Sequence, residues 1–418
     1  MFHLKKDFAC LLAALLLCVL SACGTADVEA DSSVAPSASV VQSSSAQAAE
    51  PSSDAQPISS SEAEQKEEQP SYGLFAEGYA AAREELDTMT LEEKVAQMFL
   101  FRCPAEDALD TVRQYQPGGF MLFARDFDGK TAEQVRAELD AYQQASEIPM
   151  LLAVDEEGGT VVRVSRKPML AEKPFRSPQA VFQSGGMEGI TEDTLQKVKL
   201  LQSLGINVNF APDADVSTDP SDFIYARSFG KEGRETADFV KTSVLAYNSQ
   251  KMACTLKHFP GYGNNVDTHT GVAVDQRPYE TFEQEDFLPF AAGIEAGAPM
   301  VLVSHNIVEC MDPDRPASLS PQVHEILRDK LGFTGLILTD DLSMQAIPSY
   351  TDGENPCPAA VNAGNDLLLS SSIEADYRAL LTAVQDGVVS EERLDESVLR
   401  ILAMKYSTAL YDLERNVE

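Results

Sequence analysis

One short run of residues, 257–271, holds the side chains best suited to acid–base chemistry. It reads KHFPGYGNNVDTHTG and contains His258 and His269, two of the five histidines of the chain, together with Asp267. Its proline and glycines disfavour regular structure, so we expect a loop. A carboxylate two residues from an imidazole can bind one ring nitrogen and stabilise the imidazolium, which makes Asp267 and His269 a candidate acid/base pair. The alternative interpretation is a hydrogen-bonded surface histidine without catalytic function.

A second reactive group is expected in residues 335–344, GLILTDDLSM. Asp340 comes directly after apolar residues of strand length and Thr339, so its carboxylate is placed where a strand ends and could act as a nucleophile. Asp341 is the rival, and alternation along the strand would point it to the other side. The non-catalytic interpretation is that the pair caps the element that follows, a function that suits Asp341.

The elements that must position these groups are short apolar runs that alternate with helical stretches. We expect strands at residues 98–102, 119–124, 150–154, 206–211, 252–256, 300–304, 335–339 and 366–369. Eight strands separated by crossover helices predict an α/β fold, a (β/α)8 TIM-type barrel. An open doubly wound sheet is the alternative, but no glycine-rich phosphate fingerprint follows any strand.

Several predicted helices have recognisable first residues. Thr90 with Glu93 and Thr131 with Gln134 are capping boxes, and Ser320 is followed by a proline. The final helix is expected to begin after Ser390 and to place apolar residues on one face, namely Leu394, Val398, Ile401 and Leu402.

A barrel gathers the carboxyl ends of its strands on one face, so residues distant in sequence become neighbours there. Asp155 can accept hydrogen bonds from two hydroxyl groups at once, and the donors that would accompany it are Arg163, Arg227, Lys257 and His258. For the two arginines a structural ion pair is the alternative. We expect Gly158 and Gly159 to form a tight turn below this site, and His305 to lie behind it.

The motif KHFPGYG followed by DTH resembles the signature of family 3 glycoside hydrolases, in particular the β-N-acetylglucosaminidase branch, which runs K-H-F-P-G-H-G and then D-S-H. Tyr262 stands where that pattern has its second histidine, and Thr268 replaces the serine. The resemblance extends over most of residues 90–405. It implies retaining hydrolysis with Asp340 as nucleophile and with His269, backed by Asp267, as acid/base.

The resemblance also implies a substrate. Asp155, Arg163, Arg227, Lys257 and His258 match positions that hold a terminal N-acetylglucosamine, so the expected reaction removes this sugar from cell-wall or related glycans. Two alternatives stay open: a glycoside phosphorylase, because a neutral histidine would let phosphate approach, and a non-catalytic sugar-binding lipoprotein. Neither the motif nor the spacing of the histidines implies a cofactor or a metal.

The N-terminal residues are typical of a lipoprotein. Two lysines and an apolar run end in Leu-Ser-Ala-Cys, which predicts a signal peptide over residues 1–22 and lipidation of Cys23. An ordinary secretory signal is the alternative. Residues 23–72 are rich in Ser, Ala and Glu and predict a disordered tether, which leaves residues 73–418 for the barrel. We expect an extracytoplasmic protein held at the membrane by its lipid.

Charge and cysteine content exclude other classes. The formal net charge of −34 disfavours nucleic-acid binding. Four cysteines remain after residue 23, with no CxxC spacing, and Cys103 and Cys254 fall where buried thiols are expected. Since the sequence ends soon after the final predicted helix, we expect the barrel and its loops to supply every catalytic group.

Overall fold

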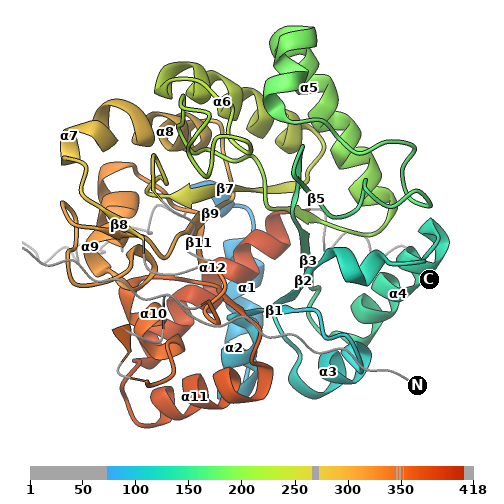
Figure 1. Ribbon diagram of the computed structural model, residues 1–418. Helices are drawn as coiled ribbons and strands as arrows, with labels where there is room; N and C mark the ends of the chain where they lie inside the picture. The colour runs from blue at the N-terminus through green and yellow to red at the C-terminus, as the bar shows by residue number, and fades with distance from the viewer. Residues whose placement is uncertain (1–72, 266–272, 345–346, 348–349, 352, 409–418) are drawn as a thin grey trace, which may run out of the picture. The chain divides into compact units, whose positions relative to one another are not determined.

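Eight short apolar segments lie side by side as parallel strands around a central axis (Figure 1). Their order around the sheet is β11-β9-β7-β6-β3-β2-β1-β12. Every predicted strand has a counterpart, and the observed bounds are β1 (Phe99–Arg102), β2 (Gly119–Leu122), β3 (Leu151–Val154), β6 (Val208–Asn209), β7 (Ala253–Phe259), β9 (Met300–Val303), β11 (Leu336–Thr339) and β12 (Leu368–Ser370).

This computed structural model describes residues 73–265, 273–344, 347, 350–351 and 353–408. All of them belong to the unit Glu68–Glu418. The predicted signal peptide, Cys23 and the predicted tether lie outside the described residues, as do Asp267 and His269.

The ring of strands closes between its two end members, β11 and β12. Leu338 and Leu367 form a parallel bridge, and the carbonyl of Ile337 accepts hydrogen bonds from the amides of Asp366 and Leu367 at 2.7 and 3.1 Å. The fold is therefore the (β/α)8 barrel that the alternating strands and helices predict.

Asp366 anchors this closure. Its carboxylate is fully buried and accepts hydrogen bonds from the amide of Ile337 at 3.0 Å, from Arg328 Nη2 at 2.5 Å and from Arg400 Nη1 at 2.5 Å. Burial would raise the pKa of Asp366, but Arg400, Arg328 and Arg393 hold it below its ordinary range. The charged carboxylate thus ties β11 and β12 to the helices behind them.

Helices surround the sheet on its outer side (Figure 1). They are α1 (Tyr79–Leu86), α2 (Leu91–Gln97), α3 (Ala108–Tyr115), α4 (Ala132–Ala145), α5 (Pro178–Ser203), α6 (Gly233–Ser249), α7 (Tyr279–Thr281), α8 (Phe287–Glu295), α9 (Pro321–Glu325), α10 (Cys357–Ala363), α11 (Ile373–Gln385) and α12 (Glu391–Ser407). Short 3-10 helices are η1 (Gly73–Phe75), η2 (Ala124–Phe127) and η4 (Ala317–Leu319), and π-helical turns are η3 (Phe282–Asp286) and η5 (Ile326–Lys330).

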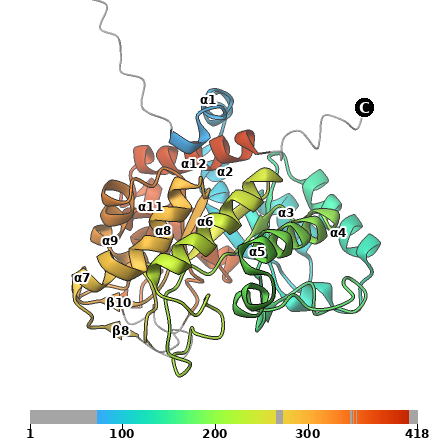
Figure 2. The same cartoon turned by 90° about the horizontal axis from the view of Figure 1, so that it is seen from above.

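Two small sheets lie outside the barrel. β4 (Glu156–Gly158) and β5 (Val161–Val162) form an antiparallel hairpin, and β8 (Val274–Asp275) pairs in parallel with β10 (Ile307–Val308). Figure 2 shows α1 at one end of the barrel and the β8/β10 pair at the opposite end. The hairpin belongs to the active-site face, because it directly follows β3.

The predicted helix starts are confirmed. Thr90 and Thr131 each form a complete capping box, and Ser320 and Ser390 accept hydrogen bonds from the amides of Val323 and Arg393. The four predicted apolar residues of the last helix are fully buried. These caps satisfy amide groups that the first helical turn leaves without partners.

Apolar side chains of the strands and of the inner helix faces form one core. Cys103, Cys254 and Cys357 are buried thiols, and Cys310 is exposed. Among the described helices, none is long and apolar enough to cross a membrane.

Lys405, on the inner face of α12, is a charged residue placed inside this core. It is fully buried, and its Nζ donates to Gln97 Oε1 at 2.8 Å, while Gln97 Nε2 donates to the carbonyl of Gln116 at 3.0 Å. Burial lowers the pKa of Lys405 from its ordinary 10.5 to about 7. Between these values the unfolded chain binds more protons than the folded chain, so stability rises with pH.

We expect Lys405→Met to remove the pH-dependent contribution that Lys405 makes to the free energy of unfolding. From about pH 7 to 9, the free energy of unfolding of the parent should rise relative to that of the variant by on the order of 1 kcal/mol per pH unit. Urea unfolding of both proteins across this range measures the difference. Lys199→Met, on the exposed side of α5, is the control and should give a difference that does not change with pH. An equally constant difference for Lys405→Met would contradict the assignment.

Candidate active site

A cavity of about 480 Å³ opens at the carboxyl ends of the barrel strands. Its walls come from strand ends all around the sheet, from Arg102 at the end of β1 to Leu369 in β12. The nucleophile candidate and the five predicted sugar-binding residues all line it: Asp340, Asp155, Arg163, Arg227, Lys257 and His258. The barrel therefore brings together groups that the sequence spreads over nearly two hundred positions.

Lys257 is the most enclosed cation of this cavity. It projects from β7, is 2% exposed, and places Nζ 2.5 Å from Asp155 Oδ1 and 2.6 Å from Glu157 Oε1. Burial would lower the pKa of Lys257, but the two carboxylates raise it above its ordinary value. The lysine stays charged, and it holds Asp155, which directly follows β3, at the cavity wall.

Glu157, in β4, joins Lys257 to a second cation. Arg227 donates to it twice, from Nη2 to Oε1 at 2.8 Å and from Nε to Oε2 at 3.1 Å. Burial would raise the pKa of Glu157, but Arg227 and Lys257 lower it below its ordinary range. Arg227 therefore forms the structural ion pair that was the alternative to sugar binding, and it also lines the cavity.

Arg163 is held more loosely. Its Nη2 lies 3.4 Å from Asp155 Oδ2, a long contact, and its side chain is 30% exposed. The turn before it is the tight one that the glycine pair predicts: Gly158 and Gly159 have φ of 106° and 66°, and a Cβ at Gly158 would lie 2.2 Å from the carbonyl oxygen of Arg176. Side chains other than hydrogen would not fit there.

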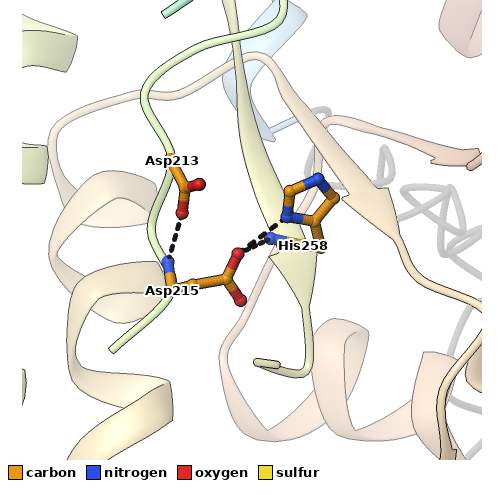
Figure 3. Close-up of side chains that lie close together, drawn as sticks. All are labelled: Asp213, Asp215 and His258. Carbon is orange, nitrogen blue, oxygen red and sulfur yellow. Dashed lines mark hydrogen bonds and ion pairs between the residues drawn. The ribbon is translucent and has the colours of Figure 1, made fainter. Parts of the chain in front are cut away.

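His258 lies inside β7, not after the strand as the sequence analysis predicts, because β7 continues to Phe259. Its Nδ1 lies 2.7 Å from Asp215 Oδ2, as Figure 3 shows, and its Nε2 lies 3.1 Å from Arg227 Nη2. Since arginine can only donate, Nε2 accepts and Nδ1 carries the proton. Burial lowers the pKa of His258, which favours this neutral form. His258 therefore orients Arg227.

The Asp213, Asp215 and His258 cluster is also where a metal ion could bind, because its candidate ligand atoms lie within 4.8 Å of one another (Figure 3). Two features oppose this. Asp215 and His258 already bond to each other, and the Arg227 guanidinium lies 3.7 Å from Asp213 Oδ2 through Nε. A divalent cation would have to break that bond beside a positive charge, so we assign no metal here.

Tyr262, which departs from the family motif, packs in the same cluster. Its ring is buried and meets His258 edge-on at 5.1 Å between centroids, and it contacts Phe223 at 5.9 Å. Its amide donates to Asp215 Oδ1 at 2.7 Å. The tyrosine thus packs against His258 and Phe223, two residues of the cavity wall.

Asp340 and Asp341 both follow β11 and both line the cavity. The expected alternation fails for Asp341 because the chain has left the strand and turns at this point. The Asp341 carboxylate accepts hydrogen bonds from the amide and hydroxyl of Ser343 and from the hydroxyl of Ser371. It therefore stabilises the turn, which leaves Asp340 as the better candidate nucleophile.

His305 is fully buried behind these residues. Its two ring nitrogens lie 2.7 Å from Ser318 Oγ and 3.0 Å from the carbonyl oxygen of Asp341. It contacts the backbone of the Asp340–Asp341 turn and does not line the cavity.

Three buried carboxylates escaped the sequence analysis: Glu157, Asp213 and Asp215. Their signals were present in VDEEGG, which begins with the last residue of β3, and in APDAD, which begins two residues after β6. The predicted acid/base pair, Asp267 and His269, lies outside the described residues.

A closed barrel with a cavity of paired charges at its carboxyl face defines the class of (β/α)8 proteins that use this face for binding and catalysis. Residues 90–404 match the glycosyl hydrolase family 3 N-terminal domain. The chain belongs to glycosyl hydrolase family 3.

Curated relatives carry related names. The chain is 31% identical over 325 residues to β-hexosaminidase A of Pseudoalteromonas piscicida, covering 71% of this chain and 54% of that protein. It is 33% identical over 289 residues to the β-hexosaminidase of Xanthomonas axonopodis pv. citri, covering 66% of this chain and 85% of that protein. The chain thus spans about half the length of the first and most of the second.

Solved structures show the same barrel. A family 3 β-N-acetylglucosaminidase from Paenibacillus sp. str. FPU-7 superposes with a TM-score of 0.71 at 31% identity, covering 78% of this chain and 64% of that one. A β-glucoside phosphorylase superposes with a TM-score of 0.71 at 25% identity, covering 81% of this chain and 62% of that one.

Glu157→Gln tests the charge network. The change leaves Arg227 and Lys257 buried with one carboxylate fewer, so we expect the free energy of unfolding to fall by about 3–5 kcal/mol. Denaturant unfolding measures this loss. Glu235→Gln removes a carboxylate that pairs with Lys231 at the surface and should cost less than about 1 kcal/mol. An equal decrease in the free energy of unfolding of the two variants would show that the ion pairs of Glu157 with Arg227 and Lys257 stabilise the fold no more than a surface pair does.

Proposed function

We propose that the protein is a retaining β-N-acetylglucosaminidase that removes terminal β-linked N-acetylglucosamine from cell-wall or related glycans. The observation that carries this proposal is the cavity in which Asp340 shares one space with Asp155, Lys257, Arg227 and His258. Membership of family 3 and the names of the relatives support the same reaction class.

Sugar binding follows from the charges of the cavity. Asp155 is fixed by Lys257, so its carboxylate oxygens face the cavity in a set position and can accept hydrogen bonds from hydroxyl groups. Arg163 and Arg227 also line the cavity, and Arg227 can donate to the hydroxyl groups of the terminal sugar. A terminal sugar held by these groups would present its anomeric carbon to Asp340.

Hydrolysis then takes two steps. In the first, a carboxylate oxygen of Asp340 bonds to the anomeric carbon, the bond from that carbon to the leaving oxygen breaks, and His269 gives this oxygen a proton. In the second, water attacks the anomeric carbon, His269 takes a proton from the water, and Asp340 is released. Asp267 would hold the histidine in the required tautomer throughout.

A second candidate function is phosphorolysis. The chain superposes on a β-glucoside phosphorylase, and two arginines of the cavity wall could attract phosphate. Phosphate would then replace water in the second step and leave a sugar phosphate as product.

We also propose an extracytoplasmic location. The signal-like residues 1–22, the cysteine at position 23 and the polar composition of residues 23–72 support a lipid anchor followed by a tether. Labelling with a radioactive fatty acid in the source bacterium, compared between the parent and Cys23→Ser, tests it: label in the parent alone is expected, and label in neither would contradict the anchor.

Turnover of an aryl β-N-acetylglucosaminide by the purified full chain tests the reaction. Asp340→Asn should lower kcat by on the order of 10³-fold or more, and His269→Ala by about 10²–10⁴-fold. Asp341→Asn is the matched control, because the Asp341 carboxylate accepts hydrogen bonds from serines of the turn. The decrease in kcat of this variant should be much smaller than that of Asp340→Asn. Product analysis with added phosphate separates hydrolysis from phosphorolysis. A parent that is inert yet binds N-acetylglucosamine would be a sugar-binding protein.

A further inference from the structure

Arg102 is a cation on the cavity wall that has no partner among the described residues. It is the last residue of β1, and its side chain has no hydrogen bond or ion pair to any described residue. Other partly buried arginines of the barrel do have carboxylate partners, such as Arg227 with Glu157 and Arg400 with Asp366. In a chain with 66 acidic and 32 basic residues, an arginine left without one is unexpected.

The position of Arg102 is fixed by stacking. Its Cζ lies 4.3 Å from the centroid of the Phe123 ring, which also lines the cavity. When the flat face of a guanidinium stacks on an aromatic ring, the N–H groups at its edge can still donate hydrogen bonds to a carboxylate or a phosphate. The ring thus holds the arginine without neutralising it.

Arg163 shares this wall. Its Cζ lies 6.0 Å from the same Phe123 ring, and its long contact to Asp155 leaves most of its donors unused. The Nε atoms of Arg102 and Arg163 are both buried, and neither has a hydrogen-bond partner among the described residues. Buried donors without partners are rare and costly in folded proteins, which points to a ligand that supplies the acceptors.

We propose that Arg102 and Arg163, stacked at Phe123, form a subsite that binds an oxyanion, either a carboxylate on the glycan or an inorganic phosphate. This inference rests on the proposed function for the sugar that lies beside it. Two of the three carboxylates that line the cavity have other partners, because Asp155 is held by Lys257 and Asp341 by serines. A local pair of arginines would offset the repulsion that a net charge of −34 exerts on an anionic substrate.

The two sources of the anion predict different substrates. A carboxylate source would be a lactyl ether on the sugar that follows the terminal N-acetylglucosamine, as in a disaccharide ending in N-acetylmuramic acid. If the anion is inorganic phosphate, the phosphate bound at the two arginines would itself accept the glycosyl group in the second step. Both use the same charge-assisted hydrogen bonds to guanidinium.

Selectivity for a charged substrate is the first measurement. We compare kcat/KM of the full chain on N-acetylglucosaminyl-N-acetylmuramic acid and on its methyl ester, which differ in one charge. The parent should prefer the acid, and Arg102→Gln should reduce the ratio of acid to ester by about tenfold. Arg102→Lys should keep part of this preference. Arg113→Gln, which removes an exposed charge from α3, should keep the parental ratio.

Phosphate is the second arm. Sugar phosphate formed from the aryl glycoside in the presence of phosphate, and reduced about tenfold in Arg102→Gln, would assign the subsite to phosphate. The subsite would be overturned if Arg102→Gln kept the parental acid-to-ester ratio and added phosphate gave no sugar phosphate. Turnover of the aryl glycoside in the same experiment would still support the hydrolase proposal.

Direct binding keeps the test independent of turnover. Calorimetric titration of the parent with N-acetylmuramic acid and with inorganic phosphate should show binding of at least one, about tenfold weaker in Arg102→Gln than in Arg113→Gln. If the parent hydrolyses nothing, this result still supports the subsite, and only the proposed function fails. Binding of neither anion, or equal binding by both variants, would overturn the subsite.

Discussion

The buried lysine between two carboxylates is the interaction on which the cavity depends. Lys257 comes from β7, whereas Asp155 and Glu157 follow β3, so their ion pairs join two strand ends that are separated in the ring by β6 alone. Glu157 extends the network to Arg227. Lys257 and Glu157 are buried, so neither can move without leaving the other short of a partner, and that constraint holds Asp155 and Arg227 at the cavity wall.

The barrel makes this network possible. Parallel strands place their last residues on one face of the barrel. The ring closes between β11 and β12, where the Asp366 carboxylate binds the amide of Ile337 and the Arg400 side chain of α12. Asp340 on one side of that seam and Arg102 on the other are thereby brought to the same cavity. The candidate nucleophile and the Arg102 guanidinium line one cavity because the ring of strands closes, not because of their spacing in the sequence.

The sequence predicted the fold well because the signals were local. Apolar runs, capping residues such as Thr90 and Ser390, and the glycine pair at Gly158 act over a few positions. The site was harder. Asp155 and Asp340 were found as strand-end acids, whereas the contacts of Glu157 and Asp215 depend on which side chains reach them from neighbouring strand ends. No local pattern encodes that pairing, nor the lack of a partner for Arg102 among the described residues.

The most direct test of the account is to trap the glycosyl-enzyme. A fluorinated N-acetylglucosaminyl fluoride reacts with a nucleophilic carboxylate and slows the hydrolysis that follows. Peptide mass mapping of the treated full chain should find one added sugar, and fragmentation should assign it to Asp340. A sugar on Asp341 or on any other residue, or turnover with no adduct on the protein, would contradict the account.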